Sequence, residues 1–63
     1  MDTYLSKLNE IIESLTAARD DAQKFDNGND AAGKRLRGVA QTAKASLQEL
    51  RVEVQSERNA RKA

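Results

Sequence analysis

Apolar residues recur at helical spacing in two stretches of the chain. In residues 4–25 the steps between them alternate between four and three, which places them on one stripe of an α-helix. The members of this stripe are Tyr4, Leu8, Ile11, Leu15, Ala18, Ala22 and Phe25. Residues 36–54 carry a second stripe of the same kind, at Leu36, Ala40, Ala43, Leu47, Leu50 and Val54. The pattern therefore predicts two helices.

One turn signal separates the two stretches, in the segment Asp26-Asn27-Gly28-Asn29-Asp30. Glycine is common just beyond a helix end because it adopts a positive φ without a steric penalty, and Gly28 is placed to do so. Asn29 or Asp30 can cap the following helix by accepting a hydrogen bond from its first N–H groups. We expect helices over about 2–26 and 30–58, a turn at 27–29 and a frayed tail at 59–63. The predicted fold is all-α, an antiparallel two-helix hairpin in a single domain over 1–63.

The short chain predicts that the hairpin pairs with a second copy. A domain of 63 residues has a marginal core, and the absence of cysteine removes disulfides as a support. Leu5 and Ile12 lie beside the first stripe and widen its apolar face beyond what one partner helix covers. We therefore expect a homo-oligomer, a dimer in the form of a four-helix bundle. The residues expected at this interface are Tyr4, Leu5, Leu8, Ile12 and Leu15.

The composition argues against catalysis and against a membrane span. The chain contains neither histidine nor cysteine, and a two-helix hairpin offers no pocket for general acid–base chemistry. We therefore expect no enzyme activity, cofactor, metal site or small-molecule substrate, and we interpret Glu49, Glu53 and Glu57 as a solvated acidic face. No apolar run approaches the roughly 18 residues that a membrane span needs. Without a signal peptide, the expected location is the cytoplasm, with no membrane partner.

Charge is distributed unevenly between the two halves. Residues 1–30 carry three basic and seven acidic residues, whereas residues 31–63 carry eight basic and three acidic residues. Lys and Arg residues, with Gln between them, follow one flank of the second helix at steps of three and four. They are Lys34, Arg37, Gln41, Lys44, Gln48, Arg51, Gln55, Arg58 and Lys62.

Two interpretations of this basic flank remain open. Arg and Lys neutralise phosphates, and Gln donates hydrogen bonds to phosphate oxygens, so the flank suits a nucleic-acid backbone. It also suits pairing with acidic side chains of another helix, in a coiled-coil module. The segment Lys34-Arg35-Leu36-Arg37 places three cations in the first turns of the second helix, where the helix dipole makes positive charge unfavourable. A sequence that accepts this cost favours the first interpretation, in which the start of the helix binds an anion. Gly33 and Gly38 allow close approach by a phosphate or by another helix, or have no such role.

The segment after the first helix resembles a known family. Gly28-Asn29-Asp30-Ala31-Ala32-Gly33-Lys34-Arg35-Leu36-Arg37 is similar to the Gly-Asn-x-Ala-Ala-x-x-Arg-x-Arg segment of bacterial linker-histone-like proteins, the chlamydial histone-like nucleoid protein family. Leu47-Gln48-Glu49-Leu50-Arg51 resembles the Leu-x-x-aromatic-Arg stretch that follows in several members. Members are small DNA-associated proteins, so the resemblance implies that Arg35, Arg37 and Arg51 contact phosphate.

Pattern and resemblance together predict a nucleoid-associated, histone-like protein that binds double-stranded DNA without sequence preference. The residues expected to contact DNA are Lys34, Arg35, Arg37, Lys44, Arg51, Arg58, Arg61 and Lys62. The alternative is an oligomerisation or protein–protein interaction module that does not bind DNA. In that case the basic flank would face an acidic helix, such as one that carries Glu10, Glu13, Asp20 and Asp21.

Overall fold

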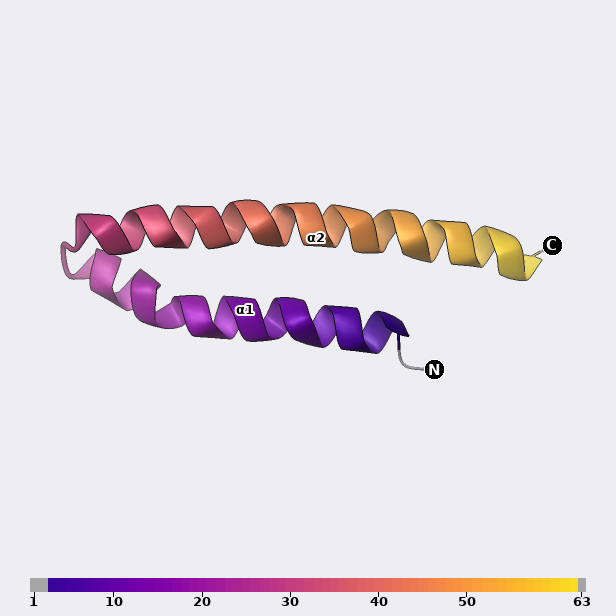
Figure 1. Cartoon of the computed structure of the whole chain (residues 1–63), viewed down its shortest axis with the longest axis horizontal. Helices are drawn as coiled ribbons and strands as arrows, with labels where there is room; N and C mark the ends of the chain where they lie inside the picture. The colour runs from indigo at the N-terminus through magenta and orange to yellow at the C-terminus, as the bar shows by residue number, and fades with distance from the viewer. Residues whose placement is uncertain (1–2, 63) are drawn as a thin grey trace.

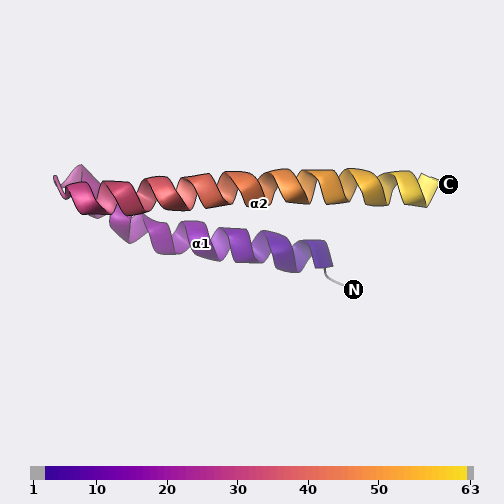
Figure 2. The same cartoon turned by 45° about the horizontal axis from the view of Figure 1, so that its top comes forward.

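The fold is a pair of long α-helices joined by one tight turn (Figure 1). A computed structural model describes residues 3–62, in which α1 spans Thr3–Asp26 and α2 spans Asp30–Lys62. The helices lie antiparallel and side by side, so that the Cα atoms form a rod of 53 × 18 × 11 Å. Figures 1 and 2 both show α2 continuing beyond the N-terminal end of α1. The prediction of an all-α helical hairpin is confirmed.

The second helix is longer than the sequence pattern indicated. It continues to Lys62, so residues 59–62, expected to fray, are helical, and only Ala63 lies outside the described residues. Side chains one turn apart support this end, since Gln55 donates to Asn59 at 3.2 Å and Arg61 pairs with Glu57 at 3.2 Å. Arg61 and Lys62 in the last turn also stabilise this end, because their positive charges lie at the negative end of the helix dipole.

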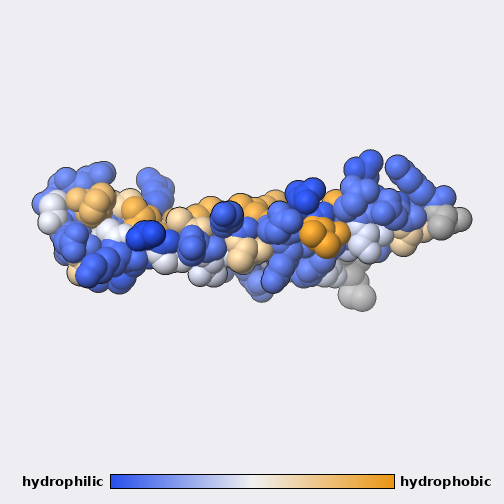
Figure 3. All heavy atoms as spheres, turned by 90° about the horizontal axis from the view of Figure 1, so that it is seen from above, coloured by the Kyte–Doolittle hydropathy of each residue, from blue (hydrophilic) through white to orange (hydrophobic). Residues whose placement is uncertain are grey.

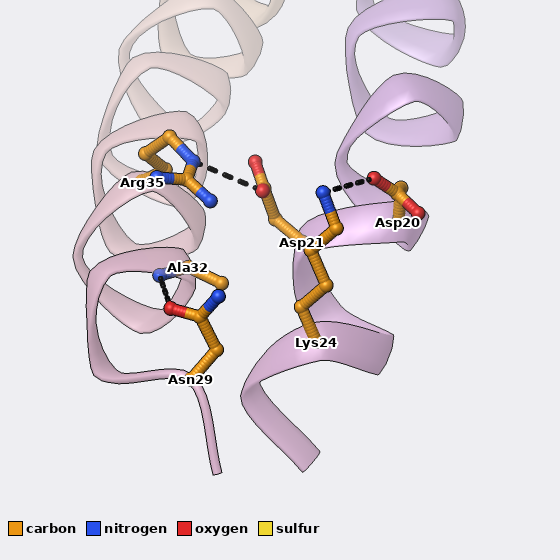
Figure 4. A network of polar contacts seen from close by, with 6 residues as sticks. All are labelled: Asp20, Asp21, Lys24, Asn29, Ala32 and Arg35. Carbon is orange, nitrogen blue, oxygen red and sulfur yellow. Dashed lines mark hydrogen bonds and ion pairs between the residues drawn. The ribbon is translucent and has the colours of Figure 1, made fainter. Parts of the chain in front are cut away.

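The turn satisfies the helix ends on both sides through backbone and side-chain hydrogen bonds. Gly28 has φ +98°, and its N–H donates to the carbonyl of Phe25 at 2.9 Å. The Asn29 N–H reaches the carbonyl of Lys24 at 2.9 Å, and this pair of bonds forms the Schellman motif that ends α1. The Asn29 side chain then begins α2, because its Oδ1 accepts a bond from the Ala32 N–H at 3.1 Å (Figure 4). Asn29 is therefore the cap.

The core of the hairpin is thin. Of the apolar residues in 3–62, only Ile11, Ala18 and Ala32 are buried, and no large side chain is fully buried. Half-buried residues of α2 complete the seam, at Leu36, Val39, Ala43, Ser46 and Leu50. A single pair of helices thus removes little apolar surface from water.

The side of α2 that faces α1 differs from the predicted one. Val39 and Ser46 belong to the seam, whereas Ala40, Leu47 and Val54, which were expected there, are exposed. The difference is a rotation of α2 about its own axis. Small and apolar residues occupy both neighbouring rows of α2, so the apolar pattern alone does not decide which row turns inward.

Ion pairs along one edge of the seam accompany this rotation. Lys7 of α1 pairs with Glu53 of α2, and Arg35 of α2 donates to Asp21 of α1 at 3.0 Å. Glu53 was predicted on a solvated acidic face; its side chain is 40% exposed and pairs with Lys7 of α1. At about 1.5 Å per residue, folding the chain back at Gly28 predicts Leu36 near Asp20 and Val54 near Asp2. Asp2 lies outside the described residues. Leu36 and Asp20 each lie one position from the Arg35–Asp21 pair, which agrees with the predicted register.

Candidate nucleic-acid interface

The basic flank forms a continuous surface on α2, away from α1. We call it the basic stripe; its nine residues are Lys34, Arg37, Gln41, Lys44, Gln48, Arg51, Gln55, Arg58 and Lys62. All nine are exposed, and the residues of α2 that face α1 lie in other rows of the helix. Figure 3 looks onto α2, where hydrophilic residues cover most of the visible face and apolar residues gather along one long edge. The stripe is therefore open to a large partner.

The cations of the stripe repeat at regular intervals. Arg37, Lys44, Arg51 and Arg58 follow one another at steps of seven residues, which on a helix corresponds to about 10.5 Å. A parallel row carries Gln41, Gln48 and Gln55 between Lys34 and Lys62 at the same step. From Lys34 to Lys62 the helix rises by about 42 Å, at about 1.5 Å per residue. The stripe thus offers evenly spaced positive charges over most of the length of α2.

Within residues 3–62, no acidic side chain pairs with a cation of the basic stripe. The ion pairs of this part of the chain involve other cations, namely Lys7, Lys24, Arg35 and Arg61. Inside the stripe, Arg51 donates to the side chain of Gln48 at 3.4 Å, a long contact between exposed groups. The positive charges of the stripe are consequently available to an external anion.

Two cations predicted to contact DNA lie elsewhere. Arg35 extends toward α1 and donates to Asp21 (Figure 4). By its helical position it lies on the border of α2 opposite the stripe. Arg61 pairs with Glu57, which belongs to the row that faces α1. The structure therefore brings Lys34, Arg37, Lys44, Arg51, Arg58 and Lys62 together and separates Arg35 and Arg61 from them. The helical spacing of Arg35 already contained this signal, because it falls outside the three- and four-residue steps of the stripe.

A groove of about 800 Å³ with an apolar floor and polar borders runs along one side of the hairpin, between the helices, although the sequence predicted no pocket. Ile11, Val39 and Leu50 contribute to its apolar surface. Glu10, Ser14 and Asp21 line it from α1, and Arg35, Thr42, Glu49 and Glu53 line it from α2. Over residues 3–62 no three acidic side chains lie close enough together to hold a metal ion. Glu53 and Glu57, two of the three glutamates on the predicted acidic face, pair with Lys7 and Arg61.

The other side of the hairpin carries an apolar face. Leu15, Ala22, Leu36 and Ala40 line a shallow hollow there, with Arg19 at its edge. Residues one or two turns away extend the same side along both helices. We define the apolar face as Leu5, Leu8, Ile12 and Leu15 of α1 with Ala40, Leu47 and Val54 of α2. Tyr4, also predicted at the oligomer interface, is half-buried, with the Lys7 ammonium 5.9 Å from its ring centre.

Comparison with protein families identifies the chain. The family model described as histone H1-like protein Hc1 matches residues 5–60, which include both helices and the turn. The chain belongs to this family. Members of the Hc1 family are histone-like DNA-binding proteins of the nucleoid, not enzymes. The family match confirms the resemblance to histone-like proteins that the sequence carries. The basic stripe of this Hc1-family hairpin lies within the matched range except for Lys62.

Two other comparisons add nothing to the Hc1 assignment. No match was found among curated proteins, and none among solved structures. Neither α1 nor α2, over the residues that the structure describes, is long and apolar enough to cross a membrane.

Proposed function

We propose that this chain binds double-stranded DNA without sequence preference, through phosphate contacts made by the basic stripe. The observation behind the proposal is that six cations share one exposed face of α2 with no acidic partner among residues 3–62. Membership of a histone-like family supports the same partner. The cations open to phosphate are Lys34, Arg37, Lys44, Arg51, Arg58 and Lys62, of which about four are expected to be neutralising a phosphate at one time.

The geometry of the stripe suits a backbone more than base edges. Long cationic side chains at steps of about 10.5 Å neutralise phosphates and release the counterions that these had condensed. The side-chain amides of Gln41, Gln48 and Gln55 lie between the cations and donate hydrogen bonds to phosphate oxygens. Phosphate contacts fix position without reading sequence, so the affinity depends on salt and hardly on base composition.

The salt dependence of DNA binding tests the proposal. With about four phosphates neutralised per subunit, log K falls against log salt with a slope of about −3.6 for each subunit engaged. A mobility shift across a salt series, on two duplexes of unrelated sequence, measures this slope. Equal slopes and affinities on both duplexes are expected. Absence of any shift at low salt would overturn the proposal and leave the protein–protein interaction module as the function.

A matched pair of variants tests which residues make the contacts. Arg51→Gln with Arg58→Gln removes two positive charges from the basic stripe and is expected to reduce the magnitude of the slope by about 1.8 per subunit. Arg35→Gln with Arg61→Gln removes the same charge from the same helix, but from side chains paired with Asp21 and Glu57. This control is expected to change the slope little. Equal losses in both variants would indicate a response to net charge and would contradict contact through the stripe.

A further inference from the structure

We infer that a second copy of this chain covers the apolar face, with α1 of each copy packed against α2 of the other. The inference concerns the assembly of the hairpin and does not depend on DNA binding. It assigns a partner and an orientation to a surface that the hairpin alone leaves in water.

The apolar face is too exposed for a hairpin that has so small a core. Leu5 is 56% exposed, Ile12 50%, Leu15 45% and Leu47 45%. By contrast, Ile11 is the only large apolar side chain that the described residues bury, with 8% of it exposed. A domain of this size has a marginal core that is commonly supplemented by a disulfide, a metal or another subunit, and the chain has no cysteine or histidine. Covering the apolar face supplies the missing burial.

The dimensions of the face match those of a dimer interface. The broad side of the rod measures 53 × 18 Å between Cα atoms. A stable interface buries about 800 Å² on each partner, and the broad side of the rod is of that order of size. The exposed aliphatic residues lie along both helices and not at one point, as expected for a rod-shaped partner. A four-helix bundle buries such a face as its inner layer.

Charges at the two borders of the face determine how the copies lie. At the α2 border stand Arg37, Lys44, Arg51 and Arg58 of the basic stripe. The outer flank of α1 carries two acids, Glu13 and Asp20, and one cation, Arg19, lies at the edge of the hollow. A two-fold axis across the rod would place α2 on α2, with two rows of cations side by side. A two-fold axis along the rod places α1 on α2 of the other copy, so that cations lie beside acids. Electrostatic complementarity selects the second arrangement.

The register of the hairpin identifies which charges would meet. Lys7 lies level with Glu53, and Asp21 lies level with Arg35. In α1, Glu13 lies close to the midpoint between Lys7 and Asp21. In α2, Lys44 is the midpoint between Arg35 and Glu53. Glu13 of one copy is therefore level with Lys44 of the second copy. By the same interpolation, Ile12 is level with Leu47. Lys34, Arg51, Arg58 and Lys62 stay outside these contacts and remain open to DNA phosphate in the dimer, whereas Arg37 and Lys44 lie at the border with the second copy.

Cysteine cross-linking tests the partner and the orientation together, because the natural chain has no cysteine. The single variants Ile12→Cys and Leu47→Cys are oxidised separately and as a mixture. A disulfide-linked dimer is expected in the mixture and not in either variant alone. Val52→Cys is the matched control, since Val52 is 54% exposed but lies about 200° around α2 from Leu50, which faces α1. It is expected not to cross-link with Ile12→Cys.

Sedimentation equilibrium of the unmodified chain at micromolar concentration supplies the mass. The mass of two chains is expected, and Ile12→Gln with Leu47→Gln is expected to lower it toward one chain, whereas Val52→Gln leaves it unchanged. Reversal of charge gives a readout that does not depend on folding: Glu13→Lys and Lys44→Glu each weaken the dimer, and the double variant restores it. A mass of one chain, or cross-linking within a single variant in place of the mixture, would overturn the inference.

Discussion

The ring of Phe25 in α1 packs directly on the backbone of Gly33 in α2. A Cβ atom at Gly33 would lie 2.4 Å from Cδ1 and 2.5 Å from Cε1 of this ring, closer than such atoms approach. Gly38, one and a half turns further along α2, has no heavy atom within 4 Å of the corresponding position. The two glycines, for which the sequence left open a close approach or no role, therefore differ. Gly33 is required by another helix of the same chain, and no neighbouring atom requires Gly38.

Alanine at the two glycines is expected to have opposite effects. Gly38→Ala adds helix propensity without a clash and is expected to stabilise the hairpin by up to about 1 kcal/mol. Gly33→Ala forces the Phe25 ring, which is 48% exposed, away from α2, and loss of this contact is expected to outweigh the same gain of up to about 1 kcal/mol. Thermal unfolding followed by circular dichroism, at one chain concentration, measures both. In a Phe25→Ala background Gly33→Ala should become stabilising; if it stays destabilising, the ring is not the cause.

Substitution of Gly28 is expected to destabilise the hairpin through the backbone alone. Its φ of +98° is unfavourable for an L-residue, and nothing lies within 4 Å of an added Cβ, so no steric contact contributes. Gly28→Val is expected to lower the free energy of unfolding by about 1–2 kcal/mol, a decrease in melting temperature of several degrees. Gly28→Asn is the control, since Asn tolerates positive φ better, and its loss should be smaller. Equal losses from Val and Asn would contradict a conformational cause.

The Lys7–Glu53 ion pair is expected to contribute modestly and to depend on both partners. The two side chains are 39% and 40% exposed, and pairs of this kind are worth about 0.2–1 kcal/mol. Lys7→Glu alone should destabilise the hairpin because it places two carboxylates together, and adding Glu53→Lys should restore most of the loss. Unfolding at low and high salt measures the effect, which salt should reduce. Additive effects of the two reversals would show that the side chains do not interact.

A dimer of this orientation is expected to connect two DNA duplexes. With α1 of each copy against α2 of the other, the two basic stripes lie on opposite sides of the bundle. A bead-bound duplex loaded with protein should therefore capture a second, labelled duplex. Ile12→Gln with Leu47→Gln should retain binding to one duplex and lose capture of the second, whereas Val52→Gln should do both. Capture by the first variant would show that bridging does not need the apolar face, and this result leaves DNA binding itself unaffected.

The sequence by itself determined the two helices, the turn between them and the family. Each of these depends on neighbouring residues: the steps of three and four, the positive φ available to Gly28, and the capping oxygen of Asn29. The basic stripe is equally local, because residues one turn apart share a face wherever the helix lies. The family match over residues 5–60 confirmed the resemblance carried by the segment after α1.

Only the tertiary structure decided which row of α2 faces α1. Val39 turned inward and Leu47 outward, although both are apolar, because small or apolar residues occupy both neighbouring rows of α2 and the helical period alone does not choose between them. The row that faces α1 is accompanied by contacts between residues far apart in the sequence. They are Lys7 with Glu53, Asp21 with Arg35, and the Phe25 ring on Gly33. Such contacts exist only when α1 lies alongside α2, and no periodicity within either helix encodes them. They gave Arg35 an acidic partner on α1, and they left an apolar face for a second chain.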